Sequence, residues 1–212
     1  MTRDIDWQRL KGMVLLHHGI FTFADDAKTS YTQMIRLVSK AEEYLRKKKA
    51  VVHFAKTKID DDLLTLANIR QTVSRARNSA VIAKWNPGNG QVAFANHPKV
   101  RGIATRGPLT PDHVIRTKRI PVIIGRDQQK DIERFAKEYQ QYFQRHATAG
   151  LKPLDPAPRW AVWPGCGTIT FGTTLDEANI INDINAHTID AILQAEKLGG
   201  WQALSEKDIF EV

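Results

Sequence analysis

One pattern occurs twice in this chain, 148 residues apart, and constrains the fold more than any other feature. The first copy reads His17-His18-Gly19-Ile20-Phe21-Thr22-Phe23, and the second reads Gly165-Cys166-Gly167-Thr168-Ile169-Thr170-Phe171. Each copy follows a hydrophobic run and precedes a polar turn and a long amphipathic stretch, which predicts strand, turn, strand and helix in an α/β fold. The repeat indicates either a duplicated unit or a chance recurrence of an arrangement common in α/β proteins.

The spacing of apolar residues predicts the helix that follows each copy. The first helix is expected from Asp26 to Lys49 and the second from Thr174 to Leu198, where Asp26 and Thr174 are suitable N-caps. The inward face of the first helix comprises Ala27, Tyr31, Met34, Ile35, Val38, Ala41 and Leu45. The inward face of the second comprises Ile181, Ile184, Thr188, Ala191 and Ala195. We expect both helices to bury these stripes against a sheet in the same way.

Further elements are predicted between and after the two copies. We expect helices over residues 61–77 and 127–146, strands over 80–85 and 120–124, and a short helix from Ser205. The segment Gln91–Phe94 is expected to be extended.

The segment that ends at Lys118 is a candidate anion-binding site. Thr110-Pro111-Asp112 has the N-cap, first-turn proline and acidic residue that favour a helix start. The candidate ligands are Thr110, His113, Arg116 and Lys118. A helix N-terminus with cations beside it can bind an anion such as a sugar phosphate. The alternative is a well-capped turn beside a buried strand.

The residues around the first copy resemble the closing segment of the class II aldolase/adducin fold. In that family an Asn-His-Gly turn after a hydrophobic strand carries the last of three zinc-binding histidines. Here His18 takes the position of that histidine and the adjacent His17 takes that of the asparagine. The chain is most similar to the aldolase part of bifunctional rhamnulose-1-phosphate aldolase/short-chain dehydrogenase proteins, and the similarity extends to Gly107–Lys118 and Asp183–Phe210.

The resemblance implies class II aldolase-like layers of sheet and helix, in two related units of which the first is partial. Residues 1–50 would be the C-terminal part of one unit, and residues 51–212 a second, degenerate unit in which Cys166 replaces the histidine. The family's other two zinc histidines and its catalytic acid lie upstream of the His-Gly turn, so no catalytic residue is assigned here. Since zinc sites normally have three or four protein ligands, we expect no zinc to be bound by this chain alone. A Gly-x-Gly-x-x-Gly turn is also absent from the sequence, so no nicotinamide site is expected.

Composition restricts the class of protein without choosing a function. The hydrophobic content of 42% and charged content of 25% are ordinary for a globular protein, and no apolar run is long enough to cross a membrane. The single cysteine excludes an internal disulfide, so a cytoplasmic location is expected. The formal net charge of +8 fits phosphorylated substrates, an acidic partner or nucleic acid. The basic residues are dispersed, which does not favour nucleic acid.

Three hypotheses follow. The favoured one is an aldolase-family fragment or degenerate domain that binds a sugar phosphate or a partner and is inactive alone. The second is an active zinc-dependent ketose-phosphate aldolase, a carbon–carbon lyase, completed by another chain or subunit. The third is a basic nucleic-acid-binding α/β domain. The partners expected under the first two hypotheses are a sugar phosphate, the missing aldolase half, a dehydrogenase domain or further copies of the chain.

Overall fold

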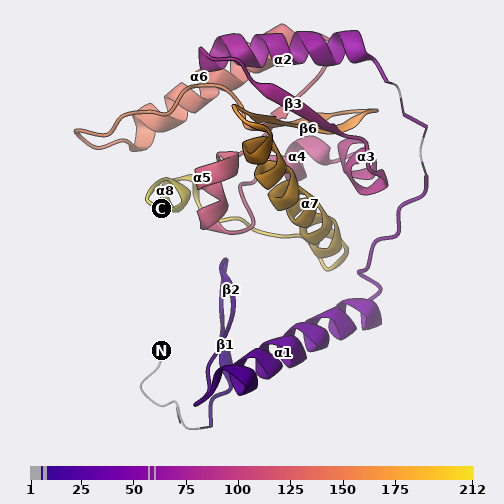
Figure 1. Ribbon diagram of the computed structural model, residues 1–212, viewed down its shortest axis with the longest axis vertical. Helices are drawn as coiled ribbons and strands as arrows, with labels where there is room; N and C mark the ends of the chain where they lie inside the picture. Colours follow the sequence, from indigo (N-terminus) through magenta and orange to yellow (C-terminus); the bar gives the residue numbers. More distant parts are fainter. Residues whose placement is uncertain (1–5, 7–8, 57, 60) are drawn as a thin grey trace.

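A four-stranded sheet between two layers of helices forms the main body of the protein (Figure 1). The computed structural model describes residue 6 and residues 9–56, 58–59 and 61–212. The sheet order is β3-β6-β5-β4, with bounds Ile82–Asn86, Gly167–Gly172, Trp160–Trp163 and Val122–Ile123 respectively. Strand β6 pairs antiparallel with both β3 and β5, whereas β4 pairs parallel with β5. The α/β fold class expected from the sequence is confirmed.

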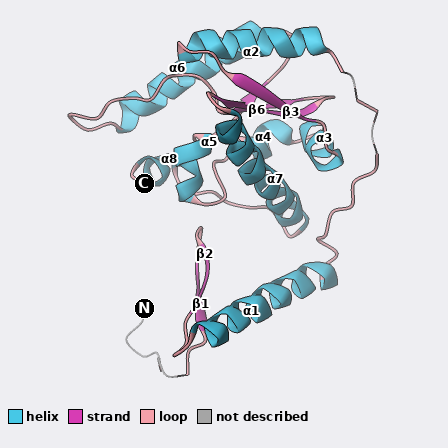
Figure 2. Cartoon of the chain, viewed as in Figure 1, coloured by secondary structure: helices cyan, strands magenta, loops and turns pink. Residues whose placement is uncertain are grey.

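Helices cover both faces of this sheet (Figure 2). On one face lie α2 (Leu63–Arg77) and α6 (Gln128–His146), which pack on a core that includes Ile169 and Phe171. The other face carries α3 (Asn89–Ala95), α4 (Val100–Ala104) and α7 (Leu175–Lys197). Strands β5 and β6 are buried along their whole length because both of their faces are covered.

Short helices complete the body: the 3-10 turn η1 (Pro111–His113), α5 (Val114–Thr117) and α8 (Glu206–Phe210). The expectation of an extended Gln91–Phe94 is wrong, because this segment lies in α3. The helical turn lets Val92 and Ala95 face the core together, and Phe94 is also fully buried. None of the helices in the described part of the chain is long and apolar enough to cross a membrane.

The N-terminal elements lie to one side of the main body and approach it at the tip of their hairpin (Figure 1). They are β1 (Gly12–Leu15), β2 (Gly19–Thr22) and α1 (Ala27–Lys47), and we call them the open unit. Within the described residues, β1 and β2 pair only with each other, and α1 packs on β2. The expectation that α1 buries its apolar stripe is wrong, because none of its residues is buried. A hairpin of two short strands is too narrow to cover the helix, and Tyr31 is 68% exposed.

The segment β5–β6–α7, which we call the closed unit, shares its turn, threonine and N-cap hydrogen bonds with the open unit. In the hairpin turns, the amide of His18 donates to Leu15 at 3.1 Å and that of Cys166 to Trp163 at 2.9 Å. The hydroxyl of Thr22 donates to the carbonyl of Ser30 at 3.0 Å, and that of Thr170 donates to the carbonyl of Ala178 at 2.9 Å. The N-caps are Asp26 and Thr174, whose side chains accept from the backbone amides of Thr29 and Glu177. All these pairs are separated by the same 148 residues as the sequence repeat.

Candidate functional site

The His17-His18 turn of the open unit meets the main body at η1. His17 has a positive φ of 63°, and Gly165 takes the same place in the closed unit with φ 84°. This turn brings the Nδ1 of His18 to 3.3 Å from the Oδ2 of Asp112, with side chains 47% and 64% exposed. The candidate metal ligand therefore has a carboxylate neighbour, in the segment from which the anion ligands were predicted.

The residues around His18 do not fit a zinc ion by themselves. A zinc site needs three or four protein ligands, and His18 is joined here by one carboxylate. No group of three or more His, Cys, Asp or Glu side chains in the described residues is placed to hold a metal ion. The counterpart of His18 in the closed unit, Cys166, is buried at 5% exposure, and its carbonyl accepts from the indole of Trp85 at 2.8 Å.

The four predicted anion ligands differ in burial and in their hydrogen-bond partners. The side chain of Thr110 makes no capping bond to η1, and Arg116 is exposed on α5. His113 is half-buried, and its buried Nδ1 has no hydrogen-bond partner among the described residues. Burial lowers the pKa of His113; Asp112 opposes this shift, and His187 adds to it.

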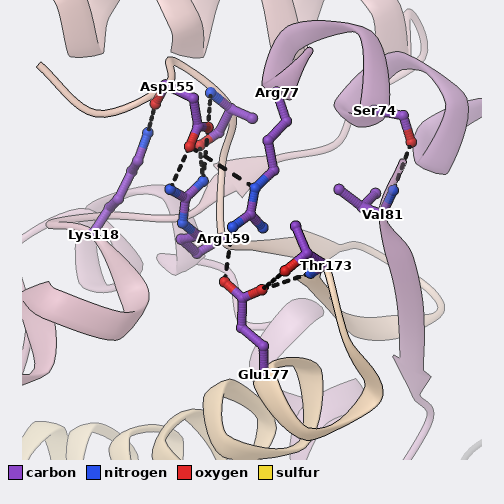
Figure 3. A network of polar contacts seen from close by, with 9 residues as sticks. Ser74, Arg77, Val81, Lys118, Asp155, Arg159, Thr173 and Glu177 are labelled. Atoms are coloured by element: carbon purple, nitrogen blue, oxygen red, sulfur yellow. Dashed lines mark hydrogen bonds and ion pairs between the residues drawn. The ribbon is translucent and has the colours of Figure 1, made fainter. Parts of the chain in front are cut away.

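The side chain of Lys118 is buried and points toward Asp155 (Figure 3). Its backbone has a positive φ of 57°, and its side chain, on a residue only 4% exposed, donates to the backbone carbonyl of Asp155. The ammonium also lies 3.7 Å from the centre of the Tyr139 ring, which provides a cation–π contact. This placement counts against a shared anion site that includes Lys118.

The carboxylate of Asp155 organises a network of buried cations around this lysine. Arg159 donates to both of its oxygens, at 2.8 and 2.7 Å, in a bidentate pair. Arg77 lies between Asp155, at 3.9 Å, and Glu177, at 2.9 Å (Figure 3). The network thereby connects α2, α7 and the segment before β5. Its ion pairs hold these three segments together, although Nη1 of Arg77 is buried without a hydrogen-bond partner among the described residues.

Two pKa shifts in this network have opposite consequences. Burial, with a smaller contribution from Arg159, lowers the pKa of Lys118 from 10.5 to about 7. Burial alone would raise the pKa of Asp155, but hydrogen bonds and charge from Arg159, together with Lys118 and Arg77, lower it overall. The aspartate is therefore stabilised as an anion, whereas the lysine is easily deprotonated.

A cavity of about 220 Å³ lies beside Lys118 and was not foreseen from the sequence. Its charged lining includes Arg119 and Arg145, and both donate to Glu206, at 2.9 and 3.0 Å. Glu206 therefore offsets part of the positive charge that an incoming anion would need, and a second carboxylate, Glu138, also lines the cavity. Glu206 is brought from α8, at the far end of the chain, and no local pattern in the sequence indicated that pairing.

Comparisons with known proteins agree with the fold. The family model described as "Aldolase class II, second domain" matches residues 60–212, well over half of the chain. A relative from Bacillus subtilis (strain 168), "Uncharacterized oxidoreductase YuxG", is 23% identical over 215 residues, which cover 92% of this chain and 31% of the relative. The chain therefore spans about a third of that relative's length. No solved structure matches significantly. The match over residues 60–212 shows that the chain belongs to the class II aldolase family.

Proposed function

We propose that this chain is a binding domain of the class II aldolase family that is catalytically inactive alone. The observation that carries the proposal is the small ligand set at His18, which is half exposed and whose Nδ1 contacts one carboxylate, that of Asp112. An aldolase of this class needs a complete metal site and an acid to move the proton of a ketose phosphate. No group of three or more His, Cys, Asp or Glu side chains in the described residues is placed to hold that metal.

Within the family, we place the chain nearest to the aldolase part of rhamnulose-1-phosphate aldolase/dehydrogenase proteins. The His-His-Gly turn and the Gly107–Lys118 segment support this placement. The name of YuxG describes an oxidoreductase, which fits a partner that carries out redox chemistry. The ligand of the domain would be a sugar phosphate or a partner polypeptide, and the exposed apolar side chains of the open unit favour the polypeptide.

Metal analysis and a cleavage assay test this proposal directly. Purified protein and the His18→Ala variant should both contain no stoichiometric zinc, and neither should release an aldehyde from rhamnulose 1-phosphate or another ketose phosphate. One zinc per chain that is lost in His18→Ala, together with cleavage activity, would contradict the proposal.

A second candidate function is an active zinc-dependent aldolase completed by another subunit. The contact between Asp112 and the Nδ1 of His18 favours it, because a carboxylate in this position orients a histidine and leaves its Nε2 available as a ligand. Such a site would need histidines from a neighbour, for example His17, His53 or His97 of a second copy. Zinc content that increases with the oligomeric state, measured by sedimentation and metal analysis together, would support this candidate.

A further inference from the structure

The open unit leaves side chains in solvent that the closed unit buries at equivalent positions. Val14 is 68% exposed, whereas its counterpart Val162 is fully buried. The same contrast holds for Phe21, 49% exposed, and its counterpart Ile169, fully buried. On the helices, Tyr44 is 54% exposed and its counterpart Ile192 only 2%. The exposed side chains lie on both strands and on the helix, so the described part of the chain does not cover this unit.

The closed unit shows what kind of structure provides such a cover. Strand β3 pairs antiparallel with the outer edge of β6, and α3, which follows β3 directly, packs against both β6 and α7. One short segment, residues 82–95, therefore covers an edge of the hairpin and part of the helix. The outer edge of β2 has no such neighbour among the described residues.

We propose that the open unit docks a partner polypeptide that lays an antiparallel strand along β2 and an apolar layer over α1. The partner would contribute a strand and a short helix equivalent to β3 and α3. Unlike β3 and α3 in this chain, they would not already be packed against a hairpin and helix of the partner itself. This inference rests on the proposed function and names the class of its partner. It is supported by the equivalent turn, cap and threonine bonds of the two units, which give the hairpin and the helix start the same local geometry.

A second copy of this chain does not suit the same place. In each copy, the β3–α3 segment is already occupied by that copy's own β6 and α7. An open unit could dock on the β3–α3 segment of a second copy only if β6 and α7 of that copy first separated from it. YuxG has ample chain for a segment of this kind, because the match covers only 31% of its length.

The closed unit also predicts the register of the docked strand. Trp85 on β3 lies opposite Ile169 on β6, and Ala83 lies opposite Phe171. The amide of Phe171 donates to Arg159 on the other side, so these pairs are of the non-hydrogen-bonded kind, in which the side chains are closer. At the equivalent place, Phe21 should lie opposite the partner residue that corresponds to Trp85.

Disulfide trapping with a synthetic peptide tests this register. The peptide has the sequence of residues 80–96 with Trp85→Cys, and it represents the partner's strand and short helix. The protein is the full chain with Phe21→Cys and Cys166→Ser, held with the peptide in a glutathione redox buffer. A control peptide carries Lys84→Cys in place of Trp85→Cys, which puts the thiol on the other face of the strand. Phe23→Cys with an Ala83→Cys peptide provides a second pair in the same register.

Docking raises the effective concentration of the paired thiols, so the matched peptides should give about tenfold more mixed disulfide than the control peptide. Tyr44→Glu should reduce this yield severalfold by placing a charge in the covered surface. Equal yields from matched and control peptides would overturn the proposal, and so would a predominant disulfide between two protein chains, which would assign the surface to a second copy. The zinc and cleavage assays test the proposed function independently, so the failure of one idea can be told from that of the other.

Discussion

The open and closed units have the same local geometry and opposite burial. In both, a turn of the same length, a threonine bond to the helix and a capped N-terminus fix how the chain folds back on itself. Only in the closed unit do neighbouring strands and helices bury the result. The comparison teaches that the local sequence determines the geometry of a hairpin and its helix, whereas their burial depends on other elements of the fold. The two units therefore have similar local geometry, but the buried closed unit should contribute much more to the free energy of unfolding than the exposed open unit.

The largest expected effect comes from the valine at the same position of each unit. Val162→Asp should destabilise the protein by several kcal/mol, roughly 4 or more, because it places an unpaired charge in the core between β5 and α7. Val14→Asp should change the free energy of unfolding by less than about 0.5 kcal/mol, because the side chain is already in solvent. Urea denaturation followed by tryptophan fluorescence measures both. Similar losses in the two variants would mean that β1 is covered in solution.

A smaller but still large effect is expected from the buried network, which has no equivalent on α1. Asp155→Ala removes the bidentate partner of Arg159, which is 7% exposed, and leaves that guanidinium buried without its counter-ion. Loss of one partner of a buried pair costs about 3–5 kcal/mol. Glu43→Ala breaks an exposed ion pair with Lys47 on α1 and serves as the control. If both variants unfold at the same urea concentration as the wild type, the network does not stabilise the main body.

The same contrast explains how much of the structure the sequence could predict. The helix starts predicted at Asp26, Asp127 and Thr174 follow from cap chemistry within one turn, and the structure confirms them. The start predicted at Asp61 lies one residue too early, because Asp62 is the N-cap of α2. The exposure of α1 could not be predicted, because an apolar stripe indicates that a helix needs a cover and not whether one is present.

The candidate site was less predictable than the fold, for a related reason. Thr110, His113, Arg116 and Lys118 are close in sequence, but the positive φ at Lys118 directs its side chain inward. Its partner Asp155 lies 37 residues further along the chain. The spacing of residues in the sequence predicts contacts within one helix or strand, but not a contact over this separation.

Lys118 should also make the stability of the main body depend on pH. Its pKa is about 7 in the folded protein and 10.5 as the unperturbed value, so between these limits the unfolded chain holds a proton that the folded chain largely lacks. Stability should therefore increase as the pH rises from 7 to 9, by at most about 1.4 kcal/mol per pH unit. In Lys118→Met this increase should be lost, whereas Lys48→Met, an exposed change beyond α1, should retain it. Urea titrations at pH 6, 7, 8 and 9 provide the measurement, and identical slopes in all three proteins would refute the assignment.

The smallest expected effects come from the two N-caps, and they compare the units most directly. Thr174 accepts from the amide of Glu177 at 3.1 Å, and Asp26 accepts from the amide of Thr29 at 2.8 Å. Thr174→Ala should lower the global stability by about 1 kcal/mol, because α7 unfolds together with the core that it covers. Asp26→Ala should leave the global midpoint unchanged and accelerate amide exchange in α1 alone, because this helix can open without exposing the main core. Hydrogen exchange by mass spectrometry, resolved over residues 27–47 and 175–197, separates the two responses. A loss of global stability in Asp26→Ala would mean that the open unit folds cooperatively with the main body, through contacts such as the one between His18 and Asp112.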